Sequence, residues 1–192
     1  IVCGGSWSDV QWAPDGAQVA FVSTSRDHKN EKLRIADAST GAVGDVLEET
    51  VATFFESGNG RVNWRVLPAS NEVIWFSQRD NWGQLYLYDL QTGRLKQPIT
   101  GGEGNVTQLL RIDEKTRQLY FLGVGKEKGR DPYFIHLYRI GMDGKGLAHL
   151  TPEDANHAVS LSPPGRYFVD SYSKPNAPAV ALLRDADGQL LS

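Results

Sequence analysis

The residues best suited to binding chemistry lie in a glycine-rich stretch from Thr53 to Arg61. It holds two adjacent aromatics, Phe54 and Phe55, then the carboxylate of Glu56 and the guanidinium of Arg61. An apolar wall beside charges of both signs could receive a peptide. The alternative is that the two phenylalanines pack inside the protein while Glu56 pairs with Arg61, since loop aromatics more often pack than bind.

A second polar stretch, Gln78–Gly83, is the most distinctive motif of the chain. Arg79 and Asp80 are expected to form hydrogen bonds that stabilise this loop, and Trp82 is expected to cover a neighbouring repeat. Such polar clusters usually stabilise a turn, so a direct role of Arg79, Asp80 or Trp82 in a substrate cleft is the less favoured alternative.

Motifs for catalysis are missing from the sequence. Gly5–Ser8 lacks the last glycine and the helix of a nucleophile elbow, and Gly58–Arg61 lacks the lysine and helix of a phosphate loop. Glu48 and Glu49 are adjacent carboxylates, but neighbouring strand residues point to opposite faces, so the two cannot share a proton without a bulge. The sequence therefore predicts no catalytic residue and no cofactor.

Metal binding is not expected either. No two histidines have metal-ligand spacing on a predicted strand face, and a surface or loop position is the favoured interpretation for all four, His28, His136, His149 and His157. Cys3 is the only cysteine, which excludes an intrachain disulfide and a cysteine-based zinc site.

The elements that must position these residues follow from an internal repeat. The stretch 71–93 indicates a strand at Val73–Phe76, the polar loop, a strand at Leu85–Tyr88 and a tight turn ending at Gly93. Three looser copies surround it. Their closing turn glycines are separated by 52, 51 and 44 residues, and they are Gly41, Gly93, Gly144 and Gly188.

A period of this length holds four short strands and is typical of propeller blades. The sequence thus predicts an all-β chain, a β-propeller fragment of about four four-stranded antiparallel blades at residues 6–50, 51–100, 101–152 and 153–192. Trp12, Trp64 and Trp75 are expected in the blade cores. The loops 24–32, 78–83, 125–132 and 173–178 share one rim with the interblade connections. A sandwich of about sixteen strands is the alternative, but it gives no reason for the period.

Composition narrows the class of protein. With 192 residues and 40% hydrophobic content the chain can bury a core. A net charge of −3 with no basic run gives no reason to expect nucleic acid, and no apolar run is long enough to span a membrane. The chain opens on Ile1 without a methionine or signal-peptide pattern, which suggests a fragment or a processed chain.

Several stretches resemble known propellers. Residues 12–16, 19–23 and 37–41 look like the blade pattern of Tol-type and peptidase propellers. Residues 54–58, 62–65 and 75–89 resemble the N-terminal propeller of bacterial dipeptidyl peptidase IV-like serine peptidases, within the prolyl oligopeptidase family. The likeness extends over essentially the whole chain.

This resemblance implies the second half of an eight-bladed propeller that caps an α/β-hydrolase domain and helps to admit short peptides. The family removes N-terminal dipeptides, preferring proline or alanine next to the cleaved bond. Its amine-binding glutamate pair would lie upstream of this chain, and its catalytic serine, aspartate and histidine downstream. The resemblance also favours an exported bacterial enzyme, periplasmic or secreted. The family loop analogous to Thr53–Arg61 contributes aromatic and arginine contacts to the substrate cleft.

Two hypotheses follow. In the first, the chain is the non-catalytic propeller portion of such a serine exopeptidase, and its partners are a peptide substrate and its own α/β-hydrolase domain. In the second, it is a non-enzymatic Tol-type module that binds a protein or peptide. A Gly-x-Ser-x-Gly motif downstream in the parent reading frame would distinguish them. In either case open blade edges are expected to favour homo-oligomers.

Overall fold

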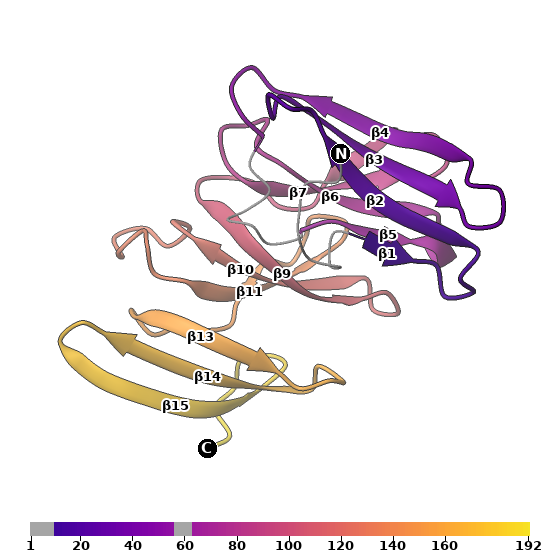
Figure 1. Cartoon of the computed structure of the whole chain (residues 1–192). Helices are drawn as coiled ribbons and strands as arrows, with labels where there is room; N and C mark the ends of the chain where they lie inside the picture. Colours follow the sequence, from indigo (N-terminus) through magenta and orange to yellow (C-terminus); the bar gives the residue numbers. More distant parts are fainter. Residues whose placement is uncertain (1–9, 56–62) are drawn as a thin grey trace. The chain divides into compact units, whose positions relative to one another are not determined.

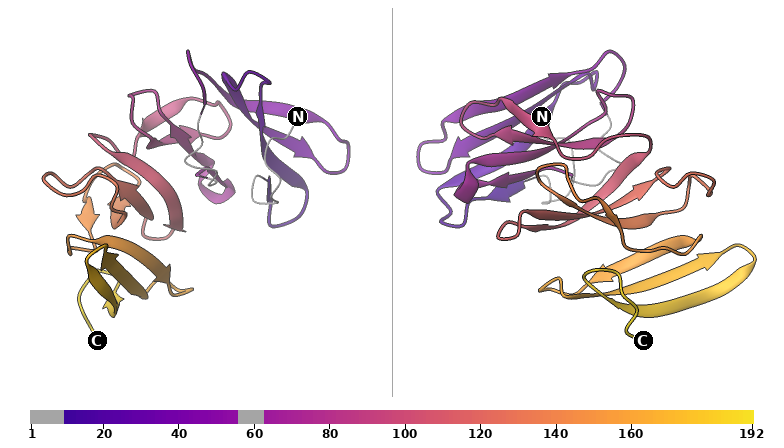
Figure 2. Two further views of the ribbon diagram at one scale, coloured as in Figure 1. Left: turned by 60° about the vertical axis from the view of Figure 1, so that its left-hand side comes forward. Right: turned by 180° about the vertical axis from the view of Figure 1, so that it is seen from behind.

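The computed structural model describes residues 10–55 and 63–192. The chain divides into two compact units, the first formed by Ile1–Asn81 with Leu85–Pro98 and the second by Trp82–Gln84 with Ile99–Ser192. Most of the strands are labelled in Figure 1, and the course of the chain can be followed by colour in the two views of Figure 2. No helix within the described ranges is long and apolar enough to cross a membrane.

The first sheet of the first unit has four antiparallel strands in chain order (Figure 1). They are β1 (Val10–Trp12), β2 (Gln18–Thr24), β3 (Asn30–Asp37) and β4 (Val43–Thr50). Apolar partners such as Ala20 and Ile35 lie opposite each other across β2 and β3. Such cross-strand pairs stabilise the sheet and fix its register.

The second sheet repeats this order. Its strands are β5 (Arg65–Leu67), β6 (Glu72–Ser77), β7 (Gln84–Asp89) and β8 (Leu95–Pro98), and a short 3-10 turn, η2 (Pro68–Ser70), joins β5 to β6. All six residues of β6 are buried. The turn after β7 closes at Gly93, whose φ is +63° and where an added Cβ would lie 2.0 Å from the carbonyl oxygen of Val46. Only glycine fits this position.

The second unit holds the other two sheets. One has the strand order β12-β11-β10-β9, and the other is three-stranded in the order β13-β14-β15. Their bounds are β9 (Asn105–Asp113), β10 (Gln118–Val124), β11 (His136–Gly141), β12 (Ala148–His149), β13 (Asn156–Leu161), β14 (Tyr167–Lys174) and β15 (Ala177–Asp185). Beyond β15, Leu190 forms a single bridge to Arg184.

Each unit has an apolar core between its own two sheets. In the first unit, Leu33 and Leu47 of one sheet pack with Val73 and Trp75 of the other. In the second unit, Tyr120 and Leu137 pack with Leu150 and Phe168. Burial of these faces is the main stabilising term, at roughly 25 cal/mol per Å² of apolar surface. The predicted all-β class and the repeated antiparallel sheets are confirmed.

Three details differ from the predictions. The predicted loop 24–32 is shorter, because Thr24 pairs with Glu31 and β3 begins at Asn30. Trp64 and Trp75 are buried as expected, but Trp12 is 59% exposed. Trp12 is the last residue of β1 and lies beside a turn. The side chain that contacts the second sheet at this point is that of its neighbour Gln11, which donates a hydrogen bond to the Val66 carbonyl. The predicted loop 173–178 is also wrong, because β14 and β15 stay paired up to Lys174 and Ala177. The connection is a tight turn at residues 175–176, whose asparagine suits such a turn.

Candidate functional site

The candidate site lies at one end of the strands of the first unit, which we call the long-loop end. It is formed by the β2–β3 loop at residues 25–29, the segment 51–55 after β4, and the loop that follows β6. The amide of Phe55 donates a 2.6 Å hydrogen bond to the carbonyl of His28, which joins the first two of these segments.

The carboxylate of Glu49, near the end of β4, anchors the long-loop end. It accepts hydrogen bonds from Nε1 of Trp75 at 2.8 Å and from Nη2 of Arg79 at 3.0 Å, together with a short one from Oγ of Ser77. Glu49 belongs to the first sheet, and Trp75 and Ser77 to the second. The carboxylate therefore links the two sheets near the point where the loops begin, and only 9% of its side chain is exposed.

Arg79 is held on several sides. Its Nε donates to Oγ of Ser77 at 2.9 Å and its Nη2 to the hydroxyl of Tyr88 at 2.6 Å. The guanidinium also lies 4.4 Å from the ring centroid of Tyr86. Asp80 accepts a 2.7 Å hydrogen bond from the Tyr86 hydroxyl. These are the loop contacts that the sequence predicted for Arg79 and Asp80.

The electrostatics fix the charge of this cluster. Burial tends to lower the pKa of Arg79, but its hydrogen bond to Tyr88 and the charge of Glu49 outweigh it and raise the pKa. Burial raises the pKa of Tyr86, and the hydrogen bond to Asp80 raises it further. Burial likewise raises the pKa of Tyr88. The cluster thus holds a permanent guanidinium cation among neutral phenols, beside the carboxylates of Glu49 and Asp80.

Arg79 retains binding capacity. Within the described residues its Nη1 has no hydrogen-bond partner, and 32% of its side chain is exposed. A rigid guanidinium with one free nitrogen can donate to a carbonyl or carboxylate oxygen of a ligand. Positioned by Glu49, Ser77 and Tyr88, it would do so with little loss of side-chain entropy.

The two adjacent phenylalanines differ in their exposure to solvent. Phe55 is buried and packs 6.1 Å from Trp75, centroid to centroid, as the packing alternative predicted. Phe54 is 52% exposed and stacks on the ring of His28 at 4.8 Å. Phe54 therefore offers an apolar surface at the long-loop end, supported from behind by an imidazole.

The remaining predicted site residues are not brought into this cluster. Glu56 and Arg61 lie outside the described residues. Trp82 is 39% exposed and belongs to the second unit. Glu49, by contrast, was missed. Strand alternation correctly separates it from Glu48, which contacts Asn30 and Lys32 on the other face, but no sequence signal indicates that it receives Trp75 and Arg79.

A polar cluster in the second unit was also missed. His136 and His157 are buried, so their assignment to the surface or to loops is wrong. Nδ1 of His136 lies 3.2 Å from Nε2 of His149, and the rings of His136 and His157 are 5.0 Å apart. Burial, followed by the charge of His149, lowers the pKa of His136 to about 4. The three rings meet because β11, β12 and β13 come together, which spacing in the sequence does not show.

Beside these rings lies a buried salt-bridge network. One potential metal-ligand atom from each of Glu153, His157 and Asp170 lies within 4.8 Å of the other two, close enough to surround a cation. Arg184, however, donates to both carboxylates. His157 is also engaged through both ring nitrogens, at 2.7 Å from Asp170 Oδ1 and 3.0 Å from the Glu153 carbonyl. The guanidinium supplies the positive charge here, and the geometry is that of an ion-pair network.

The repeated antiparallel sheets, with the longer loops of the first unit at one end of its strands, define the class of the chain as a set of β-propeller blades. A family model for the dipeptidyl peptidase IV (DPP IV) N-terminal region matches residues 5–179. The chain belongs to this family.

Relatives and solved structures agree with this family. Dipeptidyl peptidase 4 of Arthroderma otae is 26% identical over 186 residues, which is 88% of this chain and 22% of that protein. The Trichophyton rubrum enzyme of the same name is 29% identical over 172 residues, which is 88% of this chain and 20% of that protein.

Two bacterial structures show the same fold. The crystal structure of a putative dipeptidyl aminopeptidase IV from Bacteroides ovatus matches with a TM-score of 0.77 at 23% identity, over 95% of this chain and 28% of that one. Porphyromonas gingivalis dipeptidyl peptidase 4 matches with a TM-score of 0.76 at 18% identity, over 92% of this chain and 24% of that one. The chain thus spans between 20% and 28% of the length of these relatives.

Proposed function

We propose that this chain is a non-catalytic propeller portion of a DPP IV-like serine exopeptidase, and that its long-loop end helps to gate and shape the peptide-binding cleft. Membership of the DPP IV N-terminal family supports the parent class. The observation that carries the role is the presence, at one end of the first unit, of an exposed Phe54 and of a firmly held Arg79 whose Nη1 has no hydrogen-bond partner within the described residues.

The parent enzyme would release N-terminal dipeptides from Xaa-Pro and Xaa-Ala substrates. Its chemistry would be acyl transfer by a serine nucleophile and a histidine base in a separate α/β-hydrolase domain. In this arrangement the present chain would contribute binding rather than chemistry. Phe54 would cover an apolar side chain of the peptide, and Arg79 would donate to one of its oxygens. Export from the cell is part of the same proposal.

Substitution of Phe54 in the full-length parent tests the proposed role. Phe54→Ala is expected to raise KM for an Xaa-Pro substrate about five- to tenfold, as loss of an aromatic contact at a binding surface does, while kcat stays nearly unchanged. Leu95→Ala is the matched control, because Leu95 is an exposed apolar residue of β8 at the other end of the unit. Equal KM values for wild type and Phe54→Ala would contradict the proposal.

A further inference from the structure

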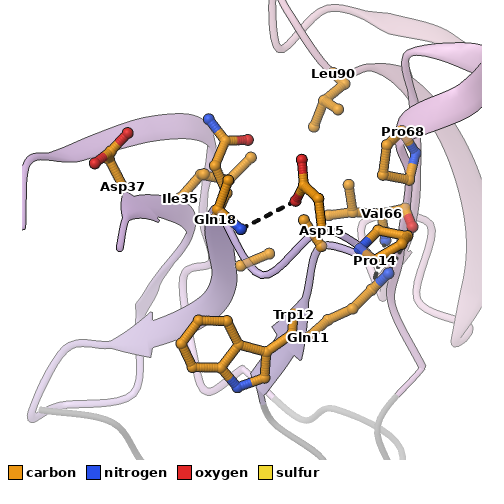
Figure 3. Close-up of a pocket in the computed structure, with 13 residues that line it drawn as sticks. Gln11, Trp12, Pro14, Asp15, Gln18, Ile35, Asp37, Val66, Pro68 and Leu90 are labelled. Atoms are coloured by element: carbon orange, nitrogen blue, oxygen red, sulfur yellow. Dashed lines mark hydrogen bonds between the residues drawn. The ribbon is translucent and has the colours of Figure 1, made fainter. Parts of the chain in front are cut away.

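The first unit contains a pocket of about 340 Å³ between the β1–β2 turn and the turns of the second sheet (Figure 3). Its two carboxylates, Asp15 and Asp37, each accept hydrogen bonds from their own turn, and Gln18 and Ile35 separate them in this view. Within the described residues, the buried side-chain atoms that lack a hydrogen-bond partner lie in the second unit instead. Such an unsatisfied buried group is the stronger indication of a ligand.

In the second unit, Nδ1 of His136 faces two other polar atoms at once. It lies 3.2 Å from the carbonyl oxygen of Thr151 and 3.2 Å from Nε2 of His149. The Thr151 carbonyl faces His149 as well, because its hydrogen bonding tends to raise the pKa of both rings. Two imidazole nitrogens and one carbonyl oxygen therefore meet here, and each can be a metal ligand.

The neighbours of the two rings decide where the protons lie. Burial is the main cause that lowers the pKa of both rings, so both are neutral at pH 7. Nδ1 of His149 lies 3.4 Å from Oε2 of Glu127. A carboxylate only accepts, so the proton of His149 lies on Nδ1 and its Nε2 keeps a lone pair. One proton on Nδ1 of His136 then serves two acceptors, the Thr151 carbonyl and His149.

The other nitrogen of His136 is unsatisfied. His136 is 2% exposed, and its Nε2 has no hydrogen-bond partner among the described residues. The ring is therefore not fixed in one tautomer from that side. Its proton can move from Nδ1 to Nε2, and the move leaves a second lone pair directed at the place where His149 and the Thr151 carbonyl already present theirs.

The spacing of the two nitrogens suits a metal ion. Two nitrogens that each lie about 2.0–2.1 Å from a tetrahedral zinc ion are about 3.3–3.4 Å apart. The 3.2 Å between Nδ1 of His136 and Nε2 of His149 is close to this separation, and it also suits the hydrogen bond of the metal-free pair. The carboxylate of Glu127 on the far nitrogen of His149 is the partner that commonly orients a metal-binding histidine.

Charge and access also bear on a cation at this position. Glu127 supplies a negative charge beside His149, whereas Arg130 opposes a cation and tends to lower the pKa of both rings. Nη1 of Arg130 donates to the Glu153 carbonyl, which holds this guanidinium in place. The side chains of His149 and Glu127 are 21% and 27% exposed. The pair therefore borders solvent on the side of these two residues, where water can complete the coordination.

We propose that Nδ1 of His136 and Nε2 of His149 bind a divalent transition-metal ion of the zinc type, with the Thr151 carbonyl and water as further ligands. Imidazole suits such ions, whereas Mg²⁺ prefers oxygen ligands. The ion joins β11 to β12 and thereby stabilises the second unit. This site is distinct from the neighbouring Glu153–His157–Asp170 network, in which Arg184 supplies the positive charge.

The test is a titration of the metal-free, isotopically labelled 192-residue chain with Zn²⁺, followed by long-range ¹H–¹⁵N NMR of the imidazole rings. One equivalent should shift Nδ1 of His136 and Nε2 of His149. We expect a dissociation constant on the order of 10 μM, because ordinary zinc sites have more protein ligands than the two nitrogens here. Mg²⁺ should shift neither nitrogen. Unchanged signals of these two nitrogens in excess Zn²⁺, or equal shifts with Mg²⁺, would overturn the proposal.

Variants make the assignment specific. His149→Gln removes one of the two nitrogen ligands at a partly exposed position and should weaken Zn²⁺ binding at least ~10-fold. His28→Gln is the matched control, because it removes the histidine of the first unit and should leave the affinity unchanged. Glu127→Gln should weaken binding about 10-fold through the orientation of His149. Binding that survives His149→Gln, or that His28→Gln abolishes, would contradict the site. The nitrogen shifts of the wild-type chain decide the question even where a variant fails to fold.

Discussion

Removal of the Glu49 carboxylate should destabilise the first unit far more than removal of its neighbour Glu48. Glu49→Ala leaves Nε1 of Trp75 and Oγ of Ser77 without their acceptor, in side chains that are 1% and 0% exposed. A buried donor without a partner costs about 1–3 kcal/mol. For the two donors the expected loss is therefore about 2–6 kcal/mol of the free energy of unfolding.

Urea unfolding followed by tryptophan fluorescence measures this loss, since Trp64 and Trp75 both lie in the core of the first unit. With a urea dependence of about 2 kcal/mol per M, in the middle of the usual range, the midpoint should fall by roughly 1–3 M. Glu49→Gln keeps one acceptor oxygen and should lose about half as much. The Glu48→Ala control, whose carboxylate is exposed and pairs with Lys32, should leave the midpoint nearly unchanged. Equal midpoints for Glu48→Ala and Glu49→Ala would refute the anchoring role.

Three further predictions concern stability. The pKa of His136 is lowered from 6.5 to about 4 in the folded chain, so between these pH values the unfolded chain takes up a proton that the folded chain does not. The free energy of unfolding therefore falls by up to about 1.4 kcal/mol for each pH unit from 6.5 down to 4. The urea midpoint of His136→Gln should depend less on pH than that of the wild type. Asp170→Ala should cost about 3–5 kcal/mol by chemical denaturation, because it removes the carboxylate that pairs with the buried guanidinium of Arg184. Asp154 is exposed, and Asp154→Ala should not change the midpoint measurably. In thermal melts, Gly41→Ala should cost about 1–2 kcal/mol from its left-handed backbone alone, and Gly93→Ala should cost more because its Cβ meets Val46; equal melting temperatures would contradict the steric argument.

The repeat and its turns could be predicted from sequence because their causes are local. Asp37 bonds to Ser39 and Thr40, and Gly41 follows in a left-handed conformation, so the turn depends on five consecutive residues. β-branched and aromatic residues define β6 in the same way. The blade pattern therefore follows from short windows of the chain.

The arrangement of the polar clusters could not be predicted, because it depends on contacts between distant segments. His149 meets His136 only through the pairing of β12 with β11, where His149 lies opposite Tyr138. Phe54 and Phe55 are adjacent and alike, yet one stacks in the open and the other is buried. Composition cannot separate such neighbours, since the direction of each side chain is set by the path of the segment after β4.

The central claim is tested most directly by dipeptide release from an Xaa-Pro chromogenic substrate, measured for the full-length parent and for this 192-residue chain at equal concentration. The account predicts activity in the parent that a serine-directed inhibitor abolishes, and none in the chain alone. Inactivity of the parent, or inhibitor-resistant hydrolysis by the purified chain, would contradict it.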